Sequence, residues 1–396
     1  MSVSRMSSIE EFSLVSGGPL FRLWRRTGLT DDDMNMVGRR VLVAVLLTWV
    51  PLLLLSMYEG RAWGGSSALP FLHDIEGQVR LLVVVPLLLL AEVRAHRELP
   101  AVVRCFVDQG LIRQADRPRF ERAIASANRL RDSVIAELLL LILVYVVGMF
   151  VIRRTQFLLD METWYATTAG HQQVLTASGW CGALVAMPAV QFLCVRWFYR
   201  FFVWGRLLWQ VSRIPMNLEP AHPDCSAGLH FIALFERSCR MVMIAFGALL
   251  AGMIANRIVY AGAELMDFKV EVVGMLALLL GMVFGPMFAF TARLQEVKHH
   301  ALEEFSRLGQ RYASEFSHKW FRSARSPGER LVGSADIQSL ADLRNSFLVV
   351  KDMHWTPFDL KDVLTLAACA LVPLIPLLLT KYSIEEIVDR LLKTVF

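Results

Sequence analysis

The sequence predicts an all-α membrane protein with about seven transmembrane helices and helical extensions on the cytoplasmic side. Three observations predict this fold. Hydrophobic residues make up 55% of the 396 residues and the mean hydropathy is +0.46, which is too apolar for an ordinary soluble domain. Charged residues gather between apolar runs of roughly 20 residues, the length that crosses a bilayer. After the sixth run, apolar residues recur in steps of three and four, which indicates a helix that continues into water.

The first half of the chain alternates basic and apolar segments, and each change of composition marks an expected boundary. The polar N-terminal stretch contains six arginines, and a second polar stretch with a helical apolar period contains nine. The second apolar run contains Pro86, which a membrane helix tolerates as a kink. The expected segments are a basic cytoplasmic N-terminal segment at 1–40, a transmembrane hairpin at 41–94 (spans at about 41–58 and 80–94), a cytoplasmic helical hairpin at 95–135, and spans three and four at 136–204 (about 136–152 and 179–204).

The second half is dominated by one long helix, which we expect to run from Val270 in the sixth span to about Phe321. No proline interrupts the chain between Pro286 and Pro327. The apolar seam beyond the membrane is close to an 11-residue repeat, so it should be straight or slightly right-handed and should need a partner. Its residues are Leu294, Val297, Ala301, Phe305, Leu308, Tyr312 and Phe316. The expected segments are a cytoplasmic connector at 205–239, spans five and six with the long cytoplasmic helix at 240–322, a cytoplasmic helical segment at 323–361, and the last span with an amphipathic tail at 362–396.

The distribution of cations predicts the orientation. Residues 1–40 contain six Arg and residues 293–361 contain eleven Lys plus Arg, whereas the loops on the opposite side contain one or two each. This asymmetry predicts a cytoplasmic N-terminus in a bacterial inner membrane. Seven spans would then put the C-terminus outside, and a re-entrant last run broken by Pro373 and Pro376 would keep it inside.

The tripeptide His222-Pro223-Asp224 is the most distinctive feature of the connector. The structural interpretation is that Asp224 caps a helix beginning at Cys225, because a carboxylate accepts hydrogen bonds from free N–H groups there. The alternatives are an anion site at that helix N-terminus, involving the loop with Gly228, or a metal site built from His222, Asp224 and His230. The spacing fits no known metal pattern, so we expect no metal ion and no cofactor.

Several charged and polar residues lie at the ends of the expected spans. Glu92 and Glu137 lie at cytoplasmic ends of spans two and three, and Arg196 and Arg200 lie at the end of span four. We expect ion pairs among them. Asn256, near the outer end of span five, is a candidate for a hydrogen bond between helices.

Span six contains the residues that we expect to form a pore and gate. Small residues let helices approach closely, so packing is the simpler interpretation. The functional interpretation is a pore-lining helix hinged at Gly285 and Pro286, with apolar residues that close it by dewetting. The residues concerned are Gly281, Met282, Phe284, Gly285 and Pro286, with Gly274, Leu278 and Met287 beside them.

Two stretches carry a resemblance to a known family. EPAHPDCSAGLHF and SADIQSLADLRNSF, followed by PF and VPLIPLLL…LLKTVF, resemble a family of uncharacterised bacterial inner-membrane proteins in which the first stretch commonly reads HPD-x-x-GGLGF. Ala227 and His230 stand where that pattern has glycine. The resemblance covers roughly residues 196–396 and implies a bacterial membrane protein of no established activity.

The leading functional hypothesis is an oligomeric ion channel gated by a cytoplasmic signal, either a protein or a small molecule. A secondary transporter with a polar site near Asn256 and Gln191 is one alternative, and a non-conducting scaffold or sensor that docks a cytoplasmic partner is the other. No phosphate-binding, nucleophile or metalloprotease motif occurs, so no enzymatic activity is expected. The basic charge is explained by the membrane orientation, so no nucleic-acid partner is expected.

Overall fold

A computed structural model describes residues 12–31, 34–64, 67–155, 162–169, 172–322 and 335–378. It confirms the all-α fold, with one antiparallel hairpin formed by β1 (Ala166–Ala169) and β2 (Gln172–Leu175). The helices of the first half are α2 (Gly18–Arg26), α3 (Val37–Tyr58), α4 (Ile75–Val79), α5 (Val85–Asp108), α6 (Arg117–Arg131), α7 (Val134–Thr155), α8 (Ala177–Cys181) and α9 (Met187–Ser212). Those of the second half are α10 (Phe235–Ala261), α11 (Lys269–Phe284), α12 (Thr291–Ser317), α13 (Ala335–Asp352), α14 (Leu360–Leu371) and α15 (Ile375–Leu378).

Short 3-10 or π segments join several of these helices into longer ones. The π-helical segments Arg80–Val84 and Gly182–Ala186 each precede a helix with proline in its first turn, where the missing N–H is tolerated. The 3-10 segments are η1 (Phe71–His73), η3 (Gln114–Asp116), η5 (His230–Leu234), η6 (Leu265–Phe268), η7 (Gly285–Phe290) and η9 (Val372–Leu374), and α12 ends in a π turn, η8 (His318–Arg322).

Five helices in the described part of the chain are long and apolar enough to cross a membrane, so the expected count of seven is not met. The expected span at 80–94 is part of a long helix, but Arg80 and Glu92 enclose only 11 uncharged residues. The expected span at 136–152 lies within α7 (Val134–Thr155), and among the described residues its apolar part is Val134–Gly148, which is shorter than the five candidates. The five candidates are Val37–Tyr58, Ala177–Ser212, His230–Ala261, Leu265–Arg322 and Leu360–Leu378.

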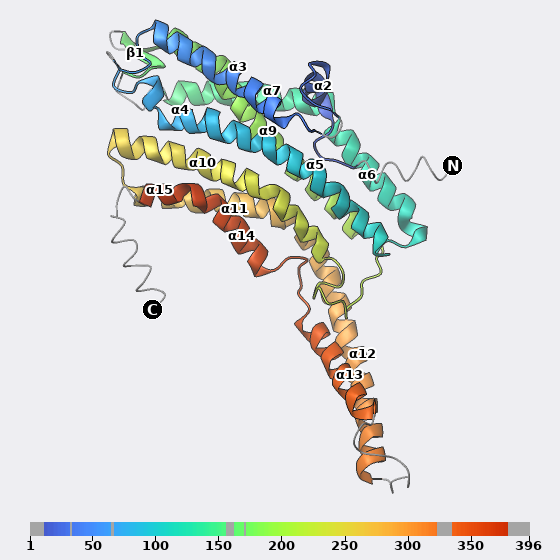
Figure 1. Cartoon of the computed structure of the whole chain (residues 1–396). Coiled ribbons are helices and arrows are strands. Elements are labelled where there is room, and N and C mark those ends of the chain that lie inside the picture. The colour runs from blue at the N-terminus through green and yellow to red at the C-terminus, as the bar shows by residue number, and fades with distance from the viewer. Residues whose placement is uncertain are drawn as a thin grey trace.

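Most long helices lie side by side in one bundle, with α10 near its centre (Figure 1). Helix α10 packs against α5 on one side and α14 on the other. A Cβ atom at Gly247 would lie 2.0 Å from the carbonyl oxygen of Ala370, so α14 rests directly on the backbone of α10. The absence of a side chain at Gly247 is therefore what allows α14 to approach so closely.

The last apolar run does not turn back on itself. It continues from α14 through η9 into α15, although Pro373 lies in η9 and Pro376 in α15. Leu377 belongs to an apolar cluster with Ala251, Ile254 and Phe268, at the opposite end of α10 from its start. The run therefore follows the length of α10, which favours a crossing helix over a re-entrant hairpin. The expected amphipathic tail lies outside the described residues.

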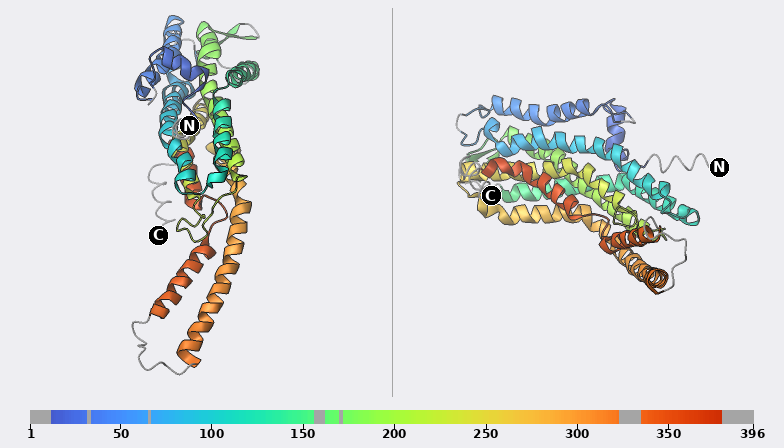
Figure 2. Two further views of the ribbon diagram at one scale, coloured as in Figure 1. Left: turned by 90° about the vertical axis from the view of Figure 1, so that its right-hand side faces the viewer. Right: turned by 60° about the horizontal axis from the view of Figure 1, so that its bottom comes forward.

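The long helix is confirmed, because the chain is continuously helical over the 58 residues Leu265–Arg322. Its second part, α12, leaves the bundle and pairs with α13 to form a stalk (Figures 1 and 2). Asp336 of α13 accepts hydrogen bonds from Lys319 Nζ at 2.7 Å and Trp320 Nε1 at 3.1 Å. Helix α13 of the same chain therefore packs against α12, which carries the apolar seam. Leu294 is fully buried, but Leu308 remains 51% exposed.

Candidate functional site

The stalk meets the bundle at a junction formed by two loops and the first turns of α12. His354 N donates to Cys225 O at 2.6 Å, and Ser226 Oγ donates to Thr356 O at 3.4 Å, so the connector loop bonds directly to the loop between α13 and α14. Lys298 Nζ of α12 donates to Met353 O at 2.7 Å. These contacts tie the stalk, the connector and the start of the last membrane helix together.

Asp224 organises the connector side of this junction. Its carboxylate accepts hydrogen bonds from the backbone N–H groups of Ser226, Gly228 and His230 at 2.9–3.1 Å and lies 2.8 Å from His222 Nδ1. Burial of the carboxylate opposes ionisation, but these donors outweigh it and hold the pKa of Asp224 below its usual range.

The structure therefore supports the capping role expected of Asp224 but corrects the position of the helix. It does cap free N–H groups, but no helix begins at Cys225: the chain first forms a loop, then η5 from His230 and α10 from Phe235. The loop is tight, because Cys225, Ala227 and Gly228 all have positive φ, of 54°, 53° and 88°. Gly228 thus contributes to the loop through its backbone conformation and its N–H group.

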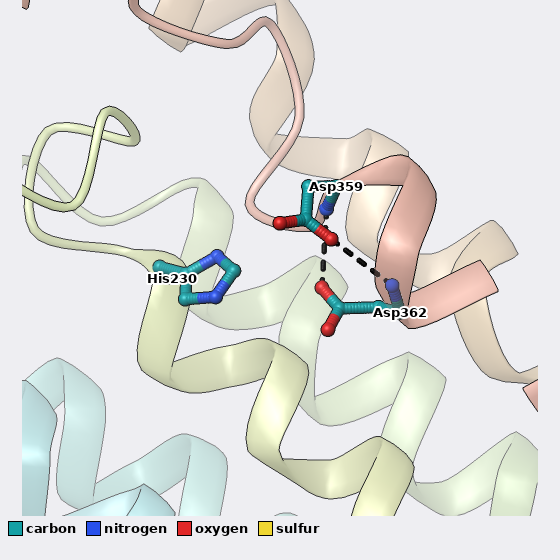
Figure 3. A group of neighbouring side chains, drawn as sticks. All are labelled: His230, Asp359 and Asp362. Carbon is teal, nitrogen blue, oxygen red and sulfur yellow. Dashed lines mark hydrogen bonds between the residues drawn. The ribbon is translucent and has the colours of Figure 1, made fainter. Parts of the chain in front are cut away.

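The metal set expected from the sequence, His222 with Asp224 and His230, is not what the structure brings together. His230 instead lies beside Asp359 and Asp362 at the start of α14, and one ligand atom from each lies within 4.8 Å of the others (Figure 3). The two carboxylates form a reciprocal capping box: Asp362 N donates to Asp359 Oδ1 at 3.0 Å and Asp359 N donates to Asp362 Oδ2 at 3.1 Å.

Each carboxylate keeps a second oxygen, and the buried His230 Nδ1 has no hydrogen-bond partner in the described part of the chain. The N–H of Asp362, which donates to the Asp359 carboxylate, is the main reason why the pKa of Asp359 lies below its usual range. One imidazole and two carboxylates form a ligand set that suits a divalent cation. Asp359 and Asp362 were not expected from the sequence as site residues, although their i, i+3 spacing before an apolar run is a capping signal.

The charged residues at the span ends form one cluster, as expected. Glu92 Oε1 lies 2.7 Å from Arg200 Nη2 and 3.5 Å from Arg196 Nη1, and Arg196 Nε lies 3.9 Å from Glu137 Oε1. The structure adds Arg40 of α3, whose Nη1 lies 3.6 Å from Glu92 Oε2. Glu92 is thus shared by three arginines from two helices.

The residues expected to form a gate do not share one face of span six. Phe284 is buried and packs against Phe358 of the loop before α14, with ring centroids 4.6 Å apart and the rings tilted by 39°. Pro286 contacts α9, since a Cβ atom at Gly205 would lie 2.9 Å from its Cγ. Gly281 faces outward, and no described atom lies within 4 Å of a Cβ built there.

The remaining members of that set divide between the two sides. Met287 is buried within the chain, whereas Met282 and Gly285 are partly exposed and Leu278 is 51% exposed. Phe288 lies on the outward side and is 56% exposed. The outward face of α11 and η7 therefore presents Leu278, Gly281 and Phe288, while Phe284 is an internal packing residue.

Asn256 makes the interhelical bond expected of it. Its Nδ2 donates to Asp74 Oδ1 at 2.6 Å, and Trp164 Nε1 donates to Asp74 Oδ2 at 2.9 Å. Gln191 lies elsewhere, next to Gly148 of α7. The two polar residues considered for a transporter site thus do not form one centre.

Together, the fold and the junction define a polytopic helical membrane protein with a two-helix stalk. Comparison of the chain with known protein families, curated proteins and solved structures finds no match.

Proposed function

We propose that the protein is an oligomeric ion channel of a bacterial inner membrane, with α11 facing the conduction path. The observation that carries the proposal is the outward face of α11. Val270 is 71% and Val273 is 64% exposed, and a Cβ atom at Gly274 or Gly281 would meet no described atom within 4 Å. A glycine-bearing apolar face that its own chain leaves uncovered is suited to close packing of helices in a membrane.

The same helix supplies a coupling between stalk and membrane. Helix α11 continues through η7 into α12 of the stalk, so the two move together unless η7 bends. Phe284 and Phe288 both contact Phe358, with centroid distances of 4.6 and 5.5 Å, and Phe358 directly precedes α14. A displacement of the stalk would therefore reach α11 and α14 at one point. Outward-facing Leu278 and Phe288 are the side chains best placed to close an apolar gate.

The gating signal that fits this junction is a divalent cation on the cytoplasmic side. His230 belongs to the helix leading into α10, and Asp359 and Asp362 belong to α14. An ion bound by all three residues would hold α10 and α14 together beside the point where Phe358 contacts α11. Zn²⁺ and Mn²⁺ are suitable probes, because imidazole and carboxylate ligands suit both.

The proposal is tested by current recordings from purified protein in planar bilayers, together with the mass of the protein in detergent. We expect discrete current steps and an oligomer in the wild type, altered steps in Phe288→Ala, and loss of both oligomer and current in Gly281→Trp. Leu47→Trp is the matched control, because Leu47 is also exposed (62%) on an apolar membrane helix and should change neither. A monomeric wild type without current would refute the channel.

A non-conducting scaffold or sensor is the second candidate, and the far part of the stalk favours it. Leu308, Phe321 and Ile337 are 51%, 76% and 50% exposed there. Exposed apolar side chains on a water-soluble hairpin are typical of a protein-binding surface. Silence in bilayers combined with retention of a cytoplasmic protein on the isolated membranes, lost in Phe321→Ser, would favour this function.

A further inference from the structure

The charged side chains of helix α2 are all positive. Arg22, Arg25 and Arg26 are exposed, and no acidic residue occurs between positions 18 and 30. Because successive residues of an α-helix are turned by about 100°, the three arginines project from one side of the helix. A short helix with such a cationic side is suited to a surface that carries negative charge.

The opposite side of α2 is apolar, and the bundle covers only part of it. Phe21 is 8% exposed, whereas Leu23 is 55% exposed. Phe21 therefore anchors α2 to the protein, and Leu23 remains an uncovered apolar side chain beside the arginines. Helices that lie in a membrane interface combine these two features, since their basic residues meet the headgroups and their apolar residues enter the boundary of the acyl chains.

The contacts of α2 place it at the level where the apolar helices begin. Leu20 N donates to the two carboxylate oxygens of Glu137 at 3.2 and 3.3 Å. Glu137 lies in the first turn of α7, whose apolar stretch starts at Val134. Figures 1 and 2 show α2 beside the start of α3, lying across the direction of the long helices. In a bilayer that contains these helices, α2 therefore lies along the membrane surface.

The partner that this arrangement fits is an anionic phospholipid. Guanidinium groups form strong, charge-assisted hydrogen bonds with phosphate oxygens. Each basic residue near an anionic membrane surface strengthens the attraction about fivefold, so three should together favour anionic over zwitterionic lipid about a hundredfold. Leu23 favours a lipid over a soluble acidic protein, because an apolar side chain at this level enters the boundary of the acyl chains without needing a pocket in a partner.

We propose that α2 binds the headgroups of anionic phospholipids through Arg22, Arg25 and Arg26, with Leu23 inserted at the boundary of their acyl chains. The proposal does not depend on whether the protein conducts ions. The competing arrangement is a helix held by protein contacts alone, through Phe21 and the Glu137 carboxylate, and such a helix would not respond to the charge of the lipid.

Hydrogen–deuterium exchange of the full chain in lipid nanodiscs tests the site. One set of nanodiscs contains phosphatidylcholine alone, and the other contains increasing fractions of phosphatidylglycerol with the same acyl chains. We expect phosphatidylglycerol to slow the exchange of the α2 amides, because a helix bound to lipid opens less often. Helix α13 of the stalk should exchange equally in both sets. Raising the salt concentration to about 0.5 M should remove most of the effect, since exposed charges are screened, and this test needs no variant.

A variant with less charge and a matched control sharpen the test. Arg22→Gln combined with Arg26→Gln should remove most of the phosphatidylglycerol effect but leave exchange in phosphatidylcholine unchanged, because glutamine has a helix propensity close to that of arginine. Arg104→Gln combined with Arg119→Gln removes the same charge near the turn between α5 and α6, which lies away from α2 (Figure 1), and should leave the effect intact. Equal exchange of α2 in the two lipids, or an effect that persists without Arg22 and Arg26, would overturn the proposal.

Discussion

Replacing Glu92 by glutamine removes the carboxylate that Arg40, Arg196 and Arg200 share. The side chain keeps its shape and one oxygen acceptor, so the substitution changes charge more than volume. The substitution leaves the cluster with one more uncompensated positive charge. All three arginines have side chains that are at most 9% exposed, so none can turn into water without opening the bundle.

The expected loss follows from removing one partner of a buried ionic network, which costs about 3–5 kcal/mol. An unfolding entropy of roughly 2.1 cal/mol/K per residue gives about 0.8 kcal/mol/K for a chain of 396 residues. The unfolding temperature should therefore fall by about 4–6 °C.

Glu236→Gln is the matched control for this prediction. Glu236 is also buried (3% exposed) and receives two hydrogen bonds from Arg240, at 2.9 and 3.0 Å. Arg240, however, is 38% exposed and can be solvated when its partner is lost, so the temperature should fall by only roughly 1–2 °C. Equal shifts in the two variants, measured at one scan rate, would refute the idea that Glu92 is the centre of the cluster.

Three further predictions concern the junction and the bundle. Gly247→Ala should destabilise the protein by about 1–3 kcal/mol, because its Cβ would lie 2.0 Å from Ala370 O, whereas Gly274→Ala should show no loss in the same unfolding assay. Zn²⁺ or Mn²⁺ at about 100 times its dissociation constant should stabilise the wild type by about 2.7 kcal/mol and leave His230→Ala unchanged in a thermal shift titration. Because the pKa of Asp224 is lowered in the folded state, this carboxylate stabilises the fold at pH values above its unfolded-state pKa near 3.8, and the stabilisation is lost as the pH falls through the lower folded-state pKa. The Asp224→Asn variant should lack this loss when its stability is followed in an acid titration. An acid transition identical to that of the wild type would contradict the prediction.

The long helix could be predicted from the sequence, because its signals (no proline and a helical apolar period) lie in neighbouring residues. An uninterrupted run from Val270 to Phe321 with a helical apolar period leaves the backbone no alternative to helix, and the structure is helical over Leu265–Arg322. The count of spans depended on a different property. Hydropathy detected the apolar stretches at 80–94 and 136–152, but span length is limited by charges at their ends, such as Arg80 and Glu92.

The candidate site was only partly predictable, because its residues are distant in sequence. Glu92, Glu137, Arg196 and Arg200 could be grouped by their expected depth at the span ends. Arg40 could not, because nothing in the sequence of a basic N-terminal segment distinguishes Arg40, which is fully buried, from the other described arginines there, which face water. His230 similarly acquires Asp359 and Asp362 as neighbours only through the packing of α14 against α10.

The position of Phe284 changes how a gate in this protein would work. Expected at first to block a pore itself, Phe284 is buried and packs on Phe358, while Phe288 one turn later lies outward and touches the same ring. Phe358 thus contacts both the internal and the outward side of the α11–α12 transition and directly precedes α14. A movement of α14 relative to α10 would shift Phe358 and, with it, the outward ring of Phe288. In the channel that we propose, this three-ring contact would couple the junction to the pore, with Phe284 holding Phe358 in place and Phe288 facing the conduction path.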